Sequence, residues 1–239
     1  KHHLNLLQPD NLKDTEFVKK LAALKPDLNI VVAFRMLPEV VWSLPEYGTI
    51  NLHASLLPQY RGAAPINWAI INGEKQTGVT TFLIDHKIDT GKILLQERVA
   101  IGDRENAGEL HDRLMKIGAE LVVKTVDSVA KGSIQPVAQD SLLTEEDIKP
   151  APKIFKEQCR INWSNPVDDV YNFIRGLSPY PAGWTEFVSS GNRYQVKVFK
   201  AEKVIVNHSV SFGAIEPDGK KILRIAAKGG YLDVLNLQL

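Results

Sequence analysis

The densest group of side chains that could do chemistry is the run Asn51-Leu52-His53-Ala54-Ser55, which continues through Leu56-Leu57-Pro58 to Arg61-Gly62. An amide and an imidazole two residues apart on a strand project from the same face, so Asn51 and His53 could reach one point. Two donors that converge on one oxygen atom could polarise a carbonyl group or stabilise an oxyanion. For an arbitrary Asn-x-His pair, however, the commoner role is structural, with both side chains satisfying nearby backbone groups.

The surrounding elements predict that this run lies at the carboxyl end of a strand in an α/β sheet. A polar helical stretch, Thr15 to Leu24, precedes the β-branched run Leu28 to Phe34, which is typical of a strand covered on both faces. A second strand is predicted over Thr49 to His53, and a helix should begin at Pro65 and end at Gly73. Open α/β sheets bind their ligands beyond the carboxyl ends of such strands.

Two further strands, over Val79 to Ile84 and Ile93 to Ile101, are predicted to form a hairpin around the turn Asp89-Thr90-Gly91. A long amphipathic helix should follow over 106–132, where a capping-box pair opens it and a glycine ends it. The alternation of strands and helices up to this point predicts an α/β layer fold.

Two domains are expected. Residues 1–132 should form a Rossmann-like α/β domain with a parallel-rich sheet, and the proline-containing segment 133–153 a linker. Residues 154–239 combine one helix with five short strand candidates separated by Gly, Asn and Asp turns, which predicts a small OB-like β-barrel. Because Lys1 is not an initiator methionine and the first strand signal comes only at Leu28, an N-terminal part of the first domain is expected to be missing.

Composition favours a globular protein of the cytoplasm. The chain is 44% hydrophobic and 24% charged, and it has neither a signal peptide nor a run near the ~20 apolar residues that cross a bilayer. Its one cysteine, Cys159, cannot form an intrachain disulfide or a thiolate metal cluster and is expected to be a small buried residue.

The formal net charge of +1 conceals an asymmetry. Residues 1–150 carry 17 Lys and Arg against 20 Asp and Glu, whereas residues 151–239 carry 12 against 8. A basic C-terminal part is consistent with a polyanionic partner, although ordinary solvated surface explains this small excess almost as well.

The pattern Asn-Leu-His-x-Ser-Leu-Leu-Pro-x-x-Arg-Gly, followed 38 residues after Asn51 by Asp89-Thr90-Gly91, resembles the signature of folate-dependent formyltransferases. The match continues through Gly78-Val79-Thr80 and Ile84-Asp85. Within that family, the segments similar to methionyl-tRNA formyltransferases are Arg61 to Ile66, Arg160 to Trp163, Ile174-Arg175 and Pro179 to Pro181. The resemblance covers nearly the whole chain.

The resemblance implies transfer of a formyl group from 10-formyltetrahydrofolate to the amino group of methionyl-initiator-tRNA during translation initiation. It matches Asn51, His53 and Asp89 to the catalytic triad, and it matches the folate-contacting loop to Ser55, Leu56, Leu57 and Pro58. No metal is implied. Initiator tRNA and folate are the expected partners, no membrane is involved, and a monomer is expected.

The chemistry of formyl transfer agrees with this assignment. The methionyl amine attacks the formyl carbon, whose oxygen becomes anionic before the folate nitrogen leaves. The Asn51 amide and a protonated His53 would donate hydrogen bonds to that oxygen. Asp89 would keep His53 charged and could relay the proton of the amine, while Asp85 and His86 are nearby rivals for its place.

Other functions stay open from sequence alone. A sugar-nucleotide N-formyltransferase and a formyltetrahydrofolate hydrolase or dehydrogenase would share the triad but have other acceptors or partner domains. A non-catalytic RNA-binding module is also compatible with a small β-barrel, but it has no need of Asn51, His53 and Asp89 together.

The C-terminal part offers two sets of candidate RNA contacts. Most of its aromatic residues are expected in the core because of their helical and strand spacing, namely Trp163, Tyr171, Phe173, Tyr180 and Trp184. Its lysines are better candidates for phosphate contact, namely Lys197, Lys200, Lys203, Lys220 and Lys221.

Overall fold

The computed structural model describes residues 4–32, 36–142, 148–217 and 222–239 of the 239-residue chain. The chain packs into two compact units, each assembled from separate stretches of sequence. Unit 1 consists of Lys1–Arg61, Val79–Glu97 and Ile117–Ile148, and unit 2 of Gly62–Gly78, Arg98–Lys116 and Lys149–Leu239.

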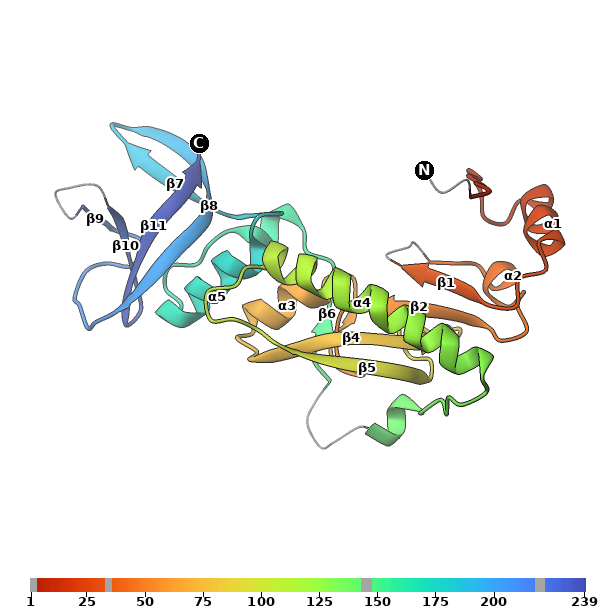
Figure 1. The fold of residues 1–239 in the computed structure, drawn as a ribbon. Coiled ribbons are helices and arrows are strands. Elements are labelled where there is room, and N and C mark those ends of the chain that lie inside the picture. Colours follow the sequence, from red (N-terminus) through yellow and green to blue (C-terminus); the bar gives the residue numbers. More distant parts are fainter. Residues whose placement is uncertain (1–3, 33–35, 143–147, 218–221) are drawn as a thin grey trace. The chain divides into compact units, whose positions relative to one another are not determined.

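A four-stranded sheet with the order β1-β2-β4-β5 confirms the predicted α/β class (Figure 1). β1 and β2 are parallel, and β2 and β4 are antiparallel, so the sheet mixes both kinds of pairing. The second predicted strand has the expected bounds, whereas the end of the first predicted strand, at Ala33 and Phe34, lies outside the described residues. The four strands are β1 (Asn29–Val32), β2 (Thr49–His53), β4 (Gln76–Leu83) and β5 (Ile93–Ala100).

The predicted helices also form, namely α1 (Thr15–Ala23), α3 (Pro65–Ile71) and α4 (Ala107–Ala130), and a short helix, α2 (Glu39–Trp42), lies between β1 and β2 in the chain. The capping box of α4 is confirmed, because the Asn106 and Glu109 side chains each accept a hydrogen bond from the other's backbone N–H, at 3.0 and 2.9 Å. Gly118 lets α4 approach β2 closely, since a Cβ there would lie 2.7 Å from a methyl carbon of Leu52. The strand that carries Asn51 and His53 is therefore covered by α4.

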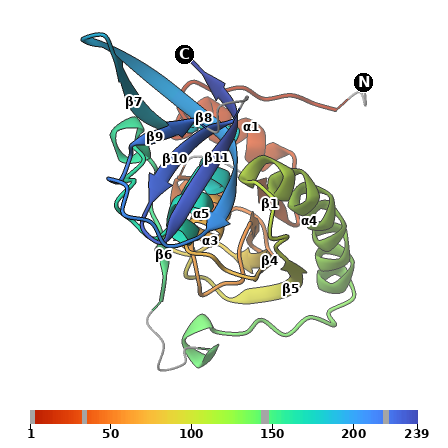
Figure 2. The ribbon, with the colours of Figure 1, turned by 90° about the vertical axis from the view of Figure 1, so that its left-hand side faces the viewer.

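Unit 2 contains an antiparallel sheet with the order β7-β8-β11-β10-β9 (Figure 2). The sheet is a curled half-barrel, because its edge strands β7 and β9 do not pair with each other in the described part of the chain. These strands follow the five predicted candidates closely: β7 (Gly183–Ser189), β8 (Asn192–Ile205), β9 (Ile215–Pro217), β10 (Leu223–Ala227) and β11 (Gly230–Gln238).

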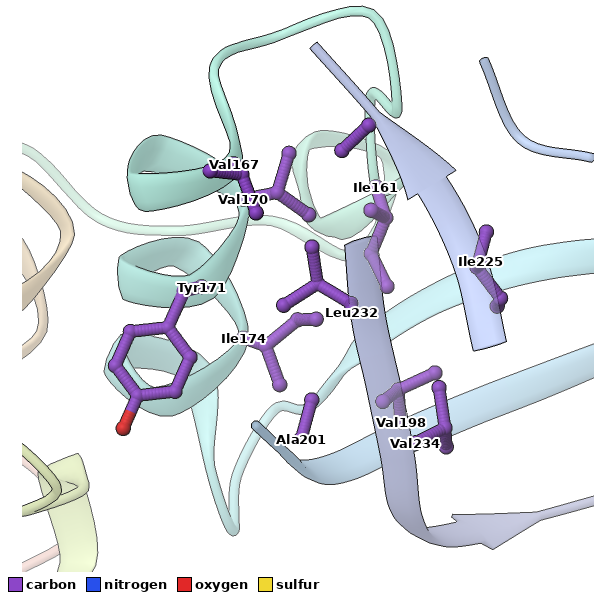
Figure 3. Close-up of a cluster of buried hydrophobic side chains, with 11 residues drawn as sticks. Ile161, Val167, Val170, Tyr171, Ile174, Val198, Ala201, Ile225, Leu232 and Val234 are labelled. Atoms are coloured by element: carbon purple, nitrogen blue, oxygen red, sulfur yellow. The ribbon is translucent and has the colours of Figure 1, made fainter. Parts of the chain in front are cut away.

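Helix α5 (Val167–Leu177) packs on one face of this sheet and forms its hydrophobic core (Figure 3). Val170 and Ile174 of the helix meet Val198 and Leu232 of the strands, and each of these side chains is at most 2% exposed. Burial of such side chains contributes about 1.5–3 kcal/mol each. The apolar face of α5 is therefore the face that packs against the sheet of unit 2.

The segment expected to be a linker contains ordered structure. Val137 forms an isolated bridge with Ile93 of β5, and a short 3-10 helix spans Gln139–Leu142. The short strand β6 (Pro150–Ala151) then pairs with β3 (Arg61–Gly62). The predicted division into 1–132, 133–153 and 154–239 stays a prediction, since the compact units are built from discontinuous stretches.

None of the described helices combines the length and the apolar character required for a membrane span. This result agrees with the short apolar runs in the sequence.

Cys159 is buried, as predicted, and should be chemically inert in the folded protein. Its surface is 1% exposed, its Sγ donates to the carbonyl oxygen of Phe155 at 3.3 Å, and burial raises the pKa of the thiol. Because the thiolate is the reactive form, an aromatic disulfide reagent at pH 7 should modify the native protein far more slowly than the urea-unfolded chain. Rapid modification under native conditions, followed by absorbance, would contradict this burial.

Candidate active site

Strand β2 carries Asn51 and His53 between β1 and β4. Asn51 pairs with Val31 of β1 and Phe82 of β4, and His53 lies opposite Thr80. Because side chains alternate along a strand, the amide and the imidazole project from one face. His53 is only 7% exposed, so its ring makes its hydrogen bonds where most water is excluded.

The two ring nitrogens of His53 face different partners. Nε2 lies 2.8 Å from the carbonyl oxygen of Tyr60, and since a carbonyl can only accept, Nε2 carries a proton. Nδ1 lies 3.8 Å from Oδ2 of Asp89, which is too long for a direct hydrogen bond but suits an ion pair with a protonated ring. The Asp89 carboxylate is thus the charge beside the nitrogen that can gain or lose a proton.

Asp89, rather than Asp85, lies beside the imidazole. The Asp89 backbone has φ of 54°, in the left-handed region, and its side chain is 11% exposed. Asp85 is exposed, and its Oδ1 accepts hydrogen bonds from Lys87 N at 2.9 Å and Thr90 Oγ1 at 2.8 Å. Asp85 therefore caps the loop between β4 and β5, as its position at the end of a strand predicts.

His86, the other nearby rival, is a surface group. Its side chain is 73% exposed, its Nδ1 lies 3.7 Å from Oε2 of Glu39, and its ring meets that of Trp42 edge to face at 5.2 Å. Glu39 and Trp42, the residues that His86 contacts, both belong to α2.

The amide oxygen of Asn51 is buried and has no hydrogen-bond partner among the residues that the structure describes. Leaving a buried carbonyl unpaired costs about 1–3 kcal/mol, so such atoms are rare in folded proteins. The amide oxygen is therefore not committed to a described structural role, which favours a role toward a ligand.

The loop after β2 is fastened to the sheet by its own polar groups. The Oγ1 of Thr80 donates to Ser55 O at 2.6 Å and accepts from Leu57 N at 3.2 Å. Gln96 Nε2 donates to Leu57 O at 2.9 Å, and the Ser55 hydroxyl donates to Gln59 O at 2.7 Å. These bonds fix the backbone that follows the catalytic candidates.

The same contacts limit what the four predicted folate-contacting residues can offer. Ser55, Leu57 and Pro58 are buried, and Leu57 packs with Phe82 and Ile93. Of the four, Leu56 alone is partly exposed. The assignment of this loop to folate stays a prediction that rests on the resemblance to folate-dependent formyltransferases.

Two side chains of this site, Gln96 and Gln139, were not singled out by the sequence analysis, and Thr80 was named there only within a motif match. Thr80 was detectable, because it lies on a predicted strand that neighbours β2. Gln139 lies in a segment with neither helical nor strand periodicity, so no pattern pointed to its burial. Within the described residues, no group of three or more His, Cys, Asp and Glu is placed to hold a metal ion.

In unit 2 the predicted aromatic residues are mostly packed. Tyr171 is buried and Trp163 and Phe173 pack against the same core, while Trp184 is partly buried and Tyr180 is 84% exposed. The prediction of a core role is therefore confirmed for most of these residues and wrong for Tyr180.

The candidate lysines differ in their surroundings. Lys197 and Lys200 on β8 are exposed, whereas Lys203 forms an ion pair with Asp168 and lies over the Tyr171 ring. Lys220 and Lys221 lie outside the described residues.

Family models match both parts of the chain. Residues 2–126 match the family described as formyl transferase, and residues 153–239 match the formyl transferase C-terminal domain. The fold is similar to that of HypX from Aquifex aeolicus, solved with tetrahydrofolic acid, with a TM-score of 0.67 at 20% identity over 93% of this chain and 37% of HypX.

Sequence relatives are much more similar. The methionyl-tRNA formyltransferase of Bacteroides thetaiotaomicron is 55% identical over 99% of this chain and 74% of the relative. That of Bacteroides fragilis is 54% identical over 100% of this chain and 74% of the relative. With two family models and relatives at this level of identity, the chain belongs to the methionyl-tRNA formyltransferase family.

Proposed function

We propose that the protein transfers the formyl group of 10-formyltetrahydrofolate to the amino group of methionine carried by initiator tRNA. The observation that carries the proposal is the buried His53–Asp89 pair on the strand of Asn51, whose amide oxygen is buried without a described partner. The name methionyl-tRNA formyltransferase, which the relatives bear, states the acceptor for those proteins.

In the proposed reaction the methionyl amine attacks the formyl carbon, and a carbon–nitrogen bond forms as the carbonyl π-electrons move to oxygen. The Asn51 amide N–H and the protonated Nδ1 of His53 donate to that oxygen. When the oxyanion collapses, the bond from carbon to folate N10 breaks, and the proton lost by the amine goes to N10. Each preorganised donor of this kind contributes about 10²–10³ in rate.

Asp89 has two roles in this scheme. Its carboxylate lies 3.8 Å from Nδ1 of His53, where it can form an ion pair with a charged ring. It can also accept the proton of the attacking amine and pass it on, a general-base role of about 10²–10⁴ in rate. The 3.8 Å gap between Nδ1 and Oδ2 exceeds a hydrogen bond, so Nδ1–H is not committed to Asp89 and can donate to a substrate oxygen.

The acceptor is tested by a single-turnover assay. Formylated folate is mixed with the enzyme and either methionyl-initiator-tRNA or a sugar-nucleotide amine, and formylated product is quantified. Rapid formylation of the tRNA alone is expected. Formylation of the sugar nucleotide without that of tRNA would contradict the proposed acceptor.

Residues 151–239 are proposed to add tRNA affinity through phosphate contacts. Their exposed Lys197 and Lys200 support this role, because such contacts need cations without an internal partner and do not read bases. Given these partners, the protein is proposed to act in the cytoplasm as a monomer.

Reversing both charges, as in Lys197→Glu with Lys200→Glu, should raise KM for charged tRNA about tenfold at physiological salt and leave kcat within about twofold. The slope of log KM against log salt should also become shallower by about one for each lost phosphate contact. Lys124→Glu with Lys131→Glu, which reverses two exposed lysines on α4 and directly after it, controls for net charge. A KM and salt slope equal to those of the control would remove these lysines from the tRNA contact.

A further inference from the structure

Gln139 is a buried amide whose polar atoms are all used within unit 1. Only 2% of the surface of Gln139 is exposed to solvent. Nε2 donates to the carbonyl oxygens of Asp89 at 2.9 Å and Gly91 at 2.8 Å. Oε1 accepts from Nε and Nη2 of Arg61 at 3.0 and 2.6 Å. An amide offers two N–H donors and one oxygen with two lone pairs, so these four bonds exhaust its capacity.

The donor side of Gln139 holds the turn that carries Asp89. The carbonyls of Asp89 and Gly91 flank Thr90, so one amide group clamps two peptide planes of the same turn. Asp89 adopts a left-handed backbone with φ of 54°, which residues with a side chain rarely adopt without support. That backbone directs the carboxylate to Nδ1 of His53.

The turn has little freedom to relax in other directions. A Cβ on Gly91 would lie 1.6 Å from the carbonyl oxygen of Leu83, so the backbone of the turn is pressed against the end of β4. Leu83 N also donates to Lys92 O at 2.9 Å. Gln139 adds two hydrogen bonds to this turn, through the carbonyl oxygens of Asp89 and Gly91.

The acceptor side of Gln139 is connected to the other nitrogen of the imidazole through Arg61 and Tyr60. Arg61, which donates twice to Oε1, directly follows Tyr60, whose carbonyl accepts the Nε2–H of His53. One buried amide therefore links the backbone on the Nε2 side of His53 with the turn on its Nδ1 side.

We propose that Gln139 is a positioning residue that sets the placement of the Asp89 carboxylate beside His53. It touches no reacting atom and acts on catalysis through Asp89. This inference rests on the proposed function for its kinetic consequence, and on the geometry alone for its effect on the His53 ring.

The test compares two substitutions of Gln139. Gln139→Met fills a similar volume without hydrogen bonds, and Gln139→Glu keeps an acceptor for Arg61 but loses both donors to the turn. Both should lower kcat by about 10- to 100-fold, because misplacing a catalytic group by about 1 Å costs up to that much. KM for formylated folate and for charged tRNA should change by no more than about twofold.

Asn67→Leu is the matched control, since it removes a part-buried amide that donates to Gly176 O at 2.7 Å within unit 2. At a temperature where all variants are fully folded by circular dichroism, the control should keep the parent kcat. In an Asp89→Asn background, Gln139→Met should change kcat by no more than about twofold, because its effect passes through Asp89. Parent kcat in Gln139→Met, or full additivity with Asp89→Asn, would overturn the proposal.

A second readout needs no turnover. In protein labelled with 13C-histidine, Gln139→Met should shift the ring signals of His53 and leave those of His208 in unit 2 unchanged. If the parent enzyme did not formylate tRNA, the proposed function would fail while this comparison still tested the placement of His53. Unchanged His53 signals in Gln139→Met would reject the positioning role whatever the acceptor.

Discussion

Replacing His53 with alanine is expected to lower kcat for formyl transfer by about 10²–10³-fold and to leave KM for the formylated folate within about twofold. The imidazole donates to an oxygen that is negatively charged only in the transition state, so its loss affects the chemical step more than ground-state binding. Asn51→Ala should behave in the same way, because its amide is the second donor on the same strand face.

Single-turnover kinetics with saturating folate separate these effects from product release. Thermal unfolding should accompany the measurement, because His53 is buried and bonded to Tyr60 O, so alanine also removes a structural contact. His53→Gln offers a check, since its amide can preserve the bond to Tyr60 O without carrying a charge. Parent rates in both His53 variants would eliminate the oxyanion role.

Asp89→Asn is expected to lower kcat by about 10²–10⁴-fold, because an amide can neither accept the amine proton nor provide a charge beside Nδ1 of His53. Single-turnover rates between pH 5 and 9 measure this loss at each pH.

Asp85→Asn is the matched control for Asp89→Asn. It removes the same charge four residues earlier on the same loop, while the new amide oxygen can still accept from Lys87 N and Thr90 Oγ1. Its kcat and pH–rate profile should stay close to those of the parent. If Asp85→Asn were the damaging variant and Asp89→Asn the silent one, the assignment of the carboxylate would be reversed.

Most elements of the fold are encoded by patterns among residues close together in the chain, which is why the sequence predicted these elements well. The strand over Thr49–His53, the capping box at Asn106 and Glu109, and the half-barrel strands all depend on periodicity, turns and caps within a few residues. The motif around Asn51 and His53 lies within one such element. The choice of these residues therefore needed no knowledge of long-range packing.

Whether neighbouring strands of the sheet pair in parallel or antiparallel was harder to predict from the sequence. A hairpin between β4 and β5 follows from a short turn, but the antiparallel pairing of β2 with β4 joins residues that are separated by α3. Likewise, unit 2 combines Gly62–Gly78 and Arg98–Lys116 with the C-terminal stretch, which no local pattern indicates. Such groupings depend on the sum of many distant contacts.

The sequence by itself determined the family, the α/β class and the identity of the candidate catalytic residues, because each is written in short motifs. Only the tertiary structure decided which nitrogen of His53 faces Asp89 and that Gln139 is buried between Arg61 and the Asp89 turn. These facts depend on contacts between residues 36 to 78 positions apart, where a difference of one bond length changes the partner. A helical or strand period carries no information at that range.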